Sequence, residues 1–262
     1  MTITNSSSNP SEAQTSSPQV NARKLIVALD VDTAAKALSL VNTLRGIVGM
    51  FKIGSQLFTA AGPNLVREIV NSGEKVFLDL KFHDIPNTVA AAGVEAARLG
   101  VSIFNVHATG GSEMMRRTVD AVQKCVDDGS LTRPQIIAVT VLTSSNQTTL
   151  SQVGFSFDAA EMVGRLALLA EAAGMDGVVA SPQEVRLVRD TVKKPGFIVV
   201  TPGVRPAGSP LGDQSRVMTP QEAITAGADY LVVGRPILSA PDPAEAARQI
   251  VQDMEMTSAN ID

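Results

Sequence analysis

The 262-residue sequence has no tryptophan, one tyrosine and a single cysteine, Cys125. Aromatic residues make up only 3% of it, so it lacks the stacking surfaces on which single-stranded nucleic acids are usually bound. One cysteine excludes an internal disulfide, which favours a reducing compartment, the cytoplasm. Because the hydrophobic fraction is 44%, we expect a large core built mainly from aliphatic side chains.

The sequence also lacks excess positive charge and long apolar runs. A formal net charge of -4 argues against a nucleic-acid partner held by phosphate neutralisation. No apolar run approaches the length of a membrane span. The segment 1–20 has no Lys or Arg, unlike a signal or transit peptide. We expect residues 1–22 to be a disordered extension and residues 23–262 to form one catalytic domain.

From residue 24 onward, short apolar runs alternate with longer stretches of helical pattern. The apolar runs predict strands at 25–29, 49–53, 76–80, 103–106, 136–141, 177–180, 197–200 and 230–233. The stretches between them predict helices at 33–44, 56–71, 86–99, 112–127, 158–173, 182–192, 220–226 and 243–254. Eight such units fit a single closed (β/α)8, or TIM, barrel of parallel strands. An open doubly wound sheet is the alternative, but no G-x-G-x-x-G follows the first strand.

Several predicted helix ends carry recognisable capping residues. Residues 181–184 (Ser-Pro-Gln-Glu) and 219–222 (Thr-Pro-Gln-Glu) are capping boxes with proline in the first turn. Gly100 and Gly174 follow predicted helices where a left-handed residue is needed. These signals support the boundaries of the helices beside which they lie.

The stretch 77–89, F-L-D-L-K-F-H-D-I-P-N-T-V, places charges in an apolar strand. Asp79 and Lys81 occupy alternate positions, so they point to the same face, roughly 6 to 7 Å apart. Since desolvating one charge alone costs several kcal/mol, the two are expected to pair. Asp84 follows just past the strand end. A salt-bridged strand end is the structural alternative to a reactive site.

Charged residues also end the first two predicted strands. Asp30 follows the first and Lys52 lies near the end of the second, and barrel enzymes place their sites at these ends. With Asp79, Lys81 and Asp84 they form a cluster of alternating sign. At 4 Å and an effective dielectric near 20, each adjacent pair gains about 4 kcal/mol before desolvation. A lysine held charged in this way suits a reaction that develops negative charge on carbon and then needs a proton.

The last predicted strand ends in features of an anion site. Gly234 allows close approach of a backbone N–H, and Arg235 offers a bidentate fork. In barrels the loops after strands seven and eight commonly bind phosphate. The segment 206–214 has the composition of a mobile loop, and Gln214 is placed to reach a phosphate as the loop closes. A flexible surface loop with a solvated arginine is the structural alternative.

Asp79 to Ile85, followed by Pro86-Asn87-Thr88, resembles the signature of the orotidine 5'-phosphate decarboxylase family. Further stretches match that family in order along the chain, at 28–30, 51–54, 141–144, 201–206, 212–214 and 233–235. The resemblance implies decarboxylation of orotidine 5'-phosphate to uridine 5'-phosphate and CO2, the last step of de novo pyrimidine synthesis. It also implies that no cofactor and no metal take part.

The resemblance assigns roles to single residues. It implies that Lys81 donates a proton to C6, that Asp79 lies near the departing carboxylate, and that Lys52 and Asp84 complete the chain of charges. The substrate-binding residues that it implies are Asp30, Lys52, Asp79, Ile85, Thr88, Thr143, Arg205, Gln214, Gly234 and Arg235. For Arg205, side-chain and backbone contact with the ligand both stay open.

Family members are homodimers, so the resemblance implies shared active sites. Asp84, Ile85 and Thr88 are expected to enter the site of the neighbouring chain. A position beyond the strand, at a helix that starts with proline, gives a physical reason for Asp84 to reach outward.

Two other functions compete with this one. Related sugar-phosphate lyases keep an Asp-x-Lys-x-x-Asp core but use magnesium held by an acidic residue on the second strand; here that position is Lys52, which repels Mg²⁺. A non-catalytic nucleotide-binding barrel has no need for paired lysines and aspartates in one pocket. Of the two histidines, His83 is expected to pack against neighbouring residues or to lie at the surface, and His107 either lines the site or has a structural role.

Overall fold

The computed structural model describes residues 21–206 and 218–255. Most of the expected extension at 1–22 therefore lies outside the described residues, as do Gln214 and most of the loop expected around it. Residues 21 and 22 are described, and there the Lys24 N–H donates to the Asn21 carbonyl at 2.9 Å.

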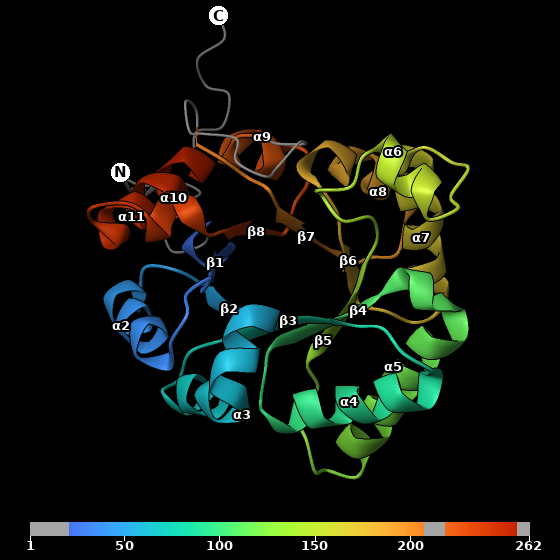
Figure 1. Ribbon diagram of the computed structural model, residues 1–262, viewed down its shortest axis with the longest axis horizontal. Helices are drawn as coiled ribbons and strands as arrows, with labels where there is room; N and C mark the ends of the chain where they lie inside the picture. Colours follow the sequence, from blue (N-terminus) through green and yellow to red (C-terminus); the bar gives the residue numbers. More distant parts are fainter. Residues whose placement is uncertain (1–20, 207–217, 256–262) are drawn as a thin grey trace, which may run out of the picture.

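Eight parallel strands form a closed barrel in which β1 pairs with both β2 and β8. The strands are β1 Leu25–Ala28, β2 Met50–Gly54, β3 Val76–Phe82, β4 Ile103–His107, β5 Gln135–Val139, β6 Gly177–Val179, β7 Ile198–Pro202 and β8 Tyr230–Val233. Figure 1 shows these strands at the centre with the helices arranged around them. The predicted (β/α)8 barrel is confirmed.

The helices that cover the barrel follow the predicted order. They are α2 Ala34–Leu44, α3 Ser55–Asn71, α4 Pro86–Arg98, α5 Gly111–Asp127, α6 Gln147–Gln152, α7 Ala159–Ala172, α8 Val185–Thr191, α9 Pro220–Thr225, α10 Arg235–Leu238 and α11 Pro243–Glu255, with the 3-10 turns η1 Ala108–Gly110 and η2 Pro182–Glu184. The helices α6 and α10 were not expected. Both are short, and a helix of one or two turns is too short to show the 3.6-residue period. The six-residue α9 was predicted because the capping box at 219–222 marks its start.

The predicted helix caps are present. The Thr219 hydroxyl accepts from the Glu222 N–H, and the Glu222 carboxylate accepts from the Thr219 N–H at 2.8 Å. Hydrogen bonds from the Thr219 N–H and from its hydroxyl to the Glu222 carboxylate lower the pKa of Glu222. Gly100 and Gly174 have φ of 78° and 84°, the left-handed conformation expected after a helix.

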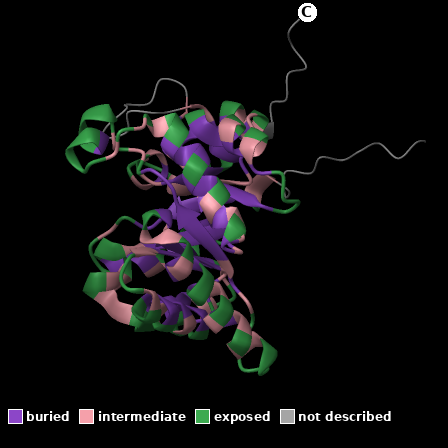
Figure 2. Ribbon diagram, turned by 90° about the vertical axis from the view of Figure 1, so that its right-hand side faces the viewer, coloured by how far each residue is buried: buried purple, intermediate pink, exposed green. Residues whose placement is uncertain are grey.

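Side chains alternate between the barrel interior and the helix layer, as the pleat of a strand requires. The interior holds an apolar cluster of Ile26, Ala28, Met50, Phe77, Ile103, Ile137, Ile198, Val200 and Val232. The intervening residues of the strands pack against the helices, and Figure 2 shows this buried layer along the central strands with exposed positions on the outer faces of the helices. The next interior position after Met50 is Lys52, and after Phe77 it is Asp79. The interior therefore changes from apolar to charged toward the carboxyl ends of the strands.

The pairing of β3 with β4 shifts register near this charged level. Leu78 pairs with Phe104, but the next pair is Phe82 with Val106, so β3 advances by more residues than β4. Within this bulge, Lys81 has φ of 53°, and no other non-glycine residue in the described ranges has a positive φ. A left-handed conformation costs a non-glycine residue about 1–2 kcal/mol.

Among the described residues, no helix is both long and apolar enough to cross a membrane.

Candidate active site

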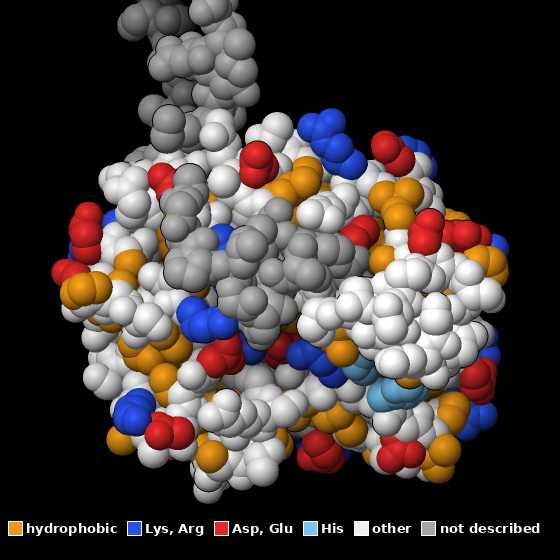
Figure 3. Space-filling view, turned by 45° about the horizontal axis from the view of Figure 1, so that its top comes forward, with side chains coloured by type: hydrophobic (Ala, Val, Ile, Leu, Met, Phe, Trp, Pro, Cys, Tyr) orange, Lys and Arg blue, Asp and Glu red, His pale blue; other side chains and the backbone are white. Residues whose placement is uncertain are grey.

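A cavity of about 420 Å³ opens at the carboxyl ends of the strands. Its lining residues are Ala28, Asp30, Lys52, Phe77, Asp79, Lys81, Val139, Val141, Leu142, Thr143, Val179, Pro202, Gly203, Arg205, Val232, Gly234 and Arg235. In Figure 3, acidic and basic side chains gather toward the middle of the face, with histidine side chains beside them. The structure therefore brings the predicted strand-end residues Asp30, Lys52, Asp79, Lys81, Thr143, Arg205, Gly234 and Arg235 together around one cavity.

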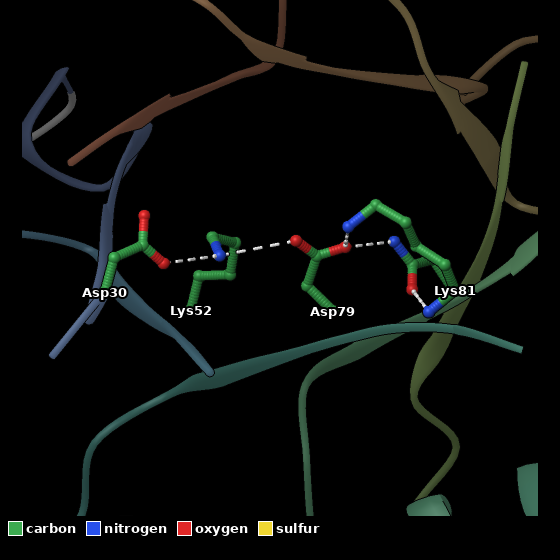
Figure 4. A network of polar contacts seen from close by, with 5 residues as sticks. Asp30, Lys52, Asp79 and Lys81 are labelled. Atoms are coloured by element: carbon green, nitrogen blue, oxygen red, sulfur yellow. Dashed lines mark hydrogen bonds and ion pairs between the residues drawn. The ribbon is translucent and has the colours of Figure 1, made fainter. Parts of the chain in front are cut away.

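Four charged side chains form a row along one wall of the cavity (Figure 4). Asp30 Oδ1 lies 3.2 Å from Lys52 Nζ, and Lys52 Nζ lies 3.3 Å from Asp79 Oδ2. Asp79 Oδ1 in turn accepts a hydrogen bond of 2.6 Å from Lys81 Nζ. The signs alternate along the row, so each inner charge has an opposite charge on both sides. The predicted pairing of Asp79 with Lys81 is confirmed.

The two inner members of the row are buried. Lys52 is 9% exposed and Asp79 is 8% exposed. An isolated charge at such a depth carries a desolvation penalty of several kcal/mol, which only close pairing offsets. Removing either inner charge would leave the other with one opposite charge instead of two, so the row acts as one electrostatic unit.

Asn105 belongs to this unit, although the sequence analysis did not include it. It is fully buried on β4. Its Nδ2 donates to Asp79 Oδ1 at 2.7 Å, and its Oδ1 accepts from the Lys81 backbone N–H at 2.8 Å. Its place two residues after the interior Ile103 was a usable signal, since a polar side chain at an interior position of a barrel strand needs a partner.

Asp84, Ile85 and Thr88 lie away from the cavity of their own chain. All three are exposed at the start of α4, and Ile85 is 66% exposed. The Asp84 carboxylate accepts from the Ile85 N–H at 2.6 Å. The grouping of Asp84 with the charges of its own chain is therefore corrected: in one chain the fourth member of the row is Asp30. Entry of Asp84 into a neighbouring site stays a prediction.

Two arginines, Arg205 and Arg235, also line the cavity. Arg205 is 9% exposed, and its guanidinium donates to the Val204 carbonyl at 2.9 Å. Arg235 begins α10 directly after β8 and is exposed. Gly234 lies so close to the row that a Cβ built there would be 3.3 Å from Asp30 Oδ2. The predicted residues Thr143, Arg205, Gly234 and Arg235 are thus brought together with the charged row.

The two histidines pack against each other beside the cavity. Their ring centroids are 5.5 Å apart. His83 is exposed, which is one of its two expected placements, and His107 is half-buried. The cavity lining includes neither, which favours the structural role of His107. Burial lowers the pKa of His107, and repulsion from His83 and Lys81 lowers it further.

Fixed lysines that alternate with carboxylates, together with two arginines, line a cavity at the carboxyl end of a (β/α)8 barrel. This arrangement defines an enzyme that acts on a small anionic substrate. Residues 23–250 match the family model described as the orotidine 5'-phosphate decarboxylase / HUMPS family. The chain belongs to this family.

Curated relatives and solved structures agree with this assignment. The chain is 58% identical to the orotidine 5'-phosphate decarboxylase of Geobacter sulfurreducens, over 88% of this chain and 95% of the relative. It is 54% identical to that of Moorella thermoacetica, over 89% and 92%. A crystal structure of orotidine 5'-phosphate decarboxylase from Lactobacillus acidophilus superposes with a TM-score of 0.77 at 36% identity, covering 88% of this chain and 99% of that one.

Proposed function

We propose that this protein decarboxylates orotidine 5'-phosphate to uridine 5'-phosphate and CO2, the last step of de novo pyrimidine synthesis. The observation that carries the proposal is the Asp30–Lys52–Asp79–Lys81 row on the cavity wall. Relatives that are more than half identical over most of the chain bear the name of this enzyme. A location in the cytoplasm goes with this reaction and agrees with the single cysteine of the sequence.

The substrate carries a phosphate at one end and the reacting carboxylate at the other, and charged residues of the cavity suit both ends. Arg235 and Gly234, with Gln214 beyond the described residues, take the phosphate, and Arg205 adds positive charge nearby. Asp30 and Lys52 bind the ribose hydroxyls. Thr143 then lies at the pyrimidine, which brings C6 toward Asp79 and Lys81. Guanidinium groups suit the phosphate because they offer two parallel N–H donors.

The reaction needs no metal ion and no cofactor in addition to the side chains of the site. The bond between C6 and the carboxylate carbon breaks, CO2 leaves, and the electron pair stays on C6. Lys81 Nζ then gives a proton to C6, and the amine regains a proton from water. Asp79, held 2.6 Å from Lys81 Nζ, keeps that donor in place beside the departing carboxylate. Charges fixed before the reaction stabilise the transition state without reorganisation.

The magnesium-dependent sugar-phosphate lyases remain the competing function. Their acidic residue on the second strand is here Lys52, which lies 3.3 Å from Asp79. A divalent cation at this place would meet an ammonium group instead of an oxygen ligand. Among the described residues, no cluster of three or more His, Cys, Asp and Glu side chains is arranged to hold a metal ion.

We further propose a homodimer in which each site is completed by the other chain. The start of α4 supports this, because Ile85 leaves an apolar side chain 66% exposed beside the exposed Asp84 and Thr88. An exposed isoleucine next to a carboxylate gives a contact surface and a charge that can extend the partner's row.

The test is release of CO2 from carboxyl-labelled orotidine 5'-phosphate by the purified protein, with and without a chelator. We expect turnover that the chelator leaves unchanged, and none with Lys81→Ala although the variant keeps the thermal stability of a folded barrel. Turnover that depends on added Mg²⁺, or activity only on a sugar phosphate, would assign the magnesium lyase function. Full activity of Lys81→Ala would remove Lys81 from the role of proton donor.

A further inference from the structure

We propose that Asn105 is a positioning residue for this reaction, which holds the Asp79 carboxylate and the backbone of Lys81 in one fixed arrangement. Its carboxamide contacts both residues, through Nδ2 to Asp79 Oδ1 at 2.7 Å and through Oδ1 from the Lys81 N–H at 2.8 Å. The kinetic part of this inference rests on the proposed function, whereas the geometric part does not.

Asn105 contacts β3 at its bulge, where the regular pairing with β4 is interrupted. Leu78 pairs with Phe104 and Phe82 with Val106, so the residues between them on β3 lose their regular ladder partners on β4. A buried backbone N–H without an acceptor is costly. The side-chain oxygen Oδ1 of Asn105 accepts the hydrogen bond from the Lys81 N–H. A side chain thus replaces the missing main-chain partner at the residue whose backbone is left-handed.

Asn105 also helps to fix the orientation of the Asp79 carboxylate. Its Oδ1 accepts from both Lys81 Nζ and Asn105 Nδ2, while its Oδ2 faces Lys52 Nζ at 3.3 Å. Two donors on one oxygen and a third on the other leave the carboxylate a single rotation. Without Asn105, the two ammonium groups alone would hold Asp79, and long flexible lysine side chains fix a direction poorly.

The amide of Asn105 satisfies both contacts because it carries a donor and an acceptor. The Lys81 N–H requires an acceptor and the Asp79 carboxylate requires a donor, so the orientation of the amide is determined by its partners. Aspartate would oppose one carboxylate to another, and leucine of similar size would offer neither group. Asn105 is fully buried, so bulk water is not at hand to replace what is lost.

The experiment compares Asn105→Leu and Asn105→Asp with a matched control, Thr118→Val. Thr118 is also fully buried, and its hydroxyl donates to the Met114 carbonyl at 2.8 Å within α5, in the helix layer. Each substitution removes a buried hydrogen bond, and each is expected to lower Tm. Only the Asn105 variants are expected to lower kcat, by about 100-fold, the scale of loss from a misplacement near 1 Å.

The KM for orotidine 5'-phosphate separates positioning from general damage. Because Arg235 and Asp30 are untouched in the Asn105 variants, we expect KM to change less than about 3-fold, a sign that ground-state binding persists. Crystal structures of the variants should show a Lys81 backbone that is no longer left-handed, or an Asp79 carboxylate that is rotated away from Lys81. A kcat in the Asn105 variants equal to that of Thr118→Val would overturn the proposal.

Hydrogen exchange of the wild-type protein tests the same contact if the variants do not fold. The Lys81 amide should exchange slowly, as a buried hydrogen-bonded amide does; rapid exchange in a folded barrel would overturn the proposal. Failure of the proposed function gives a different result, namely no turnover by the wild type. The exchange rate and the crystal structures would still decide the positioning role in that case.

Discussion

At the scale of single residues, His107 lies beside the charged row and has a pKa that its surroundings lower. Burial lowers its pKa below 6.5, His83 and Lys81 lower it further, and only Asp79 acts in the opposite direction. A histidine that resists protonation in the folded state makes folding depend on pH. Its neutral form also avoids adding a third cation beside Lys81 and Lys52.

The sign of that dependence follows from the direction of the shift. Above about pH 6.5 the side chain is neutral in both states and contributes nothing. Below it the unfolded chain takes up the proton first, so the folded state loses stability until the folded pKa is passed. We expect urea unfolding to show a smaller loss of stability between about pH 7.5 and 5.5 for His107→Gln than for the wild type.

His83→Gln is the matched control for this measurement. His83 is exposed and is only the second cause of the shift, so its replacement should preserve most of the wild-type pH dependence. The same pH dependence in His107→Gln and in the wild type would show that His107 does not carry the effect.

The contact that could be predicted from the sequence is one between two residues of the same strand. The spacing of Asp79 and Lys81 predicted their pairing because strand periodicity is local. Asn105 was missed because its partners come from a neighbouring strand, and in the sequence it is one polar residue within an apolar run. The left-handed Lys81 was missed for the same reason, since the bulge depends on how β3 meets β4.

At the scale of elements, β6 pairs with β7 through a glycine that leaves no room for a side chain. A Cβ built on Gly177 would lie 2.1 Å from the Ile198 carbonyl oxygen. Gly164, within α7, differs, because its built Cβ would have Thr191 Oγ1 as its nearest neighbour, at 3.9 Å. Alanine at Gly177 would clash with a neighbouring backbone, whereas alanine at Gly164 would not. Comparing the two substitutions therefore distinguishes the clash from the general effect of replacing glycine by alanine.

We expect Gly177→Ala to destabilise the protein by about 3 kcal/mol, because one backbone must move away from another. Gly164→Ala should instead stabilise it by about 0.5–1 kcal/mol, since alanine is the better helix former. Urea unfolding at constant m-value measures both. Equal effects of the two substitutions would contradict the steric account of the β6–β7 pairing.

The order of the elements could be predicted because each strand and most helices have their own periodic signal. The eight strands were found within about two residues, the usual margin for element ends. The short helices α6 and α10 were not. The extension of β3 to Phe82 was also missed, because its last residues pair beyond the bulge, and no local pattern reports that.

At the scale of the whole molecule, the single chain leaves an apparent contradiction. Asp84 belongs to the sequence motif of Asp79 and Lys81, yet it is exposed, and its carboxylate is held by the adjacent Ile85 N–H. A two-fold dimer resolves this if α4 of one chain starts at the cavity of the other. A motif that is continuous in sequence would then be divided between two sites.

Mixing inactive variants tests this division. In a hybrid dimer of Lys81→Ala and Asp84→Ala chains, one site carries both substitutions and the other carries neither. Random pairing therefore restores about a quarter of the sites, measured as CO2 release after subunit exchange. Lys81→Ala mixed with Asp79→Ala is the matched control, because both residues lie on β3 of one chain and every hybrid site stays defective. Recovery in the first mixture alone requires that Asp84 act across the interface, whereas no recovery after verified exchange would place the complete site within one chain.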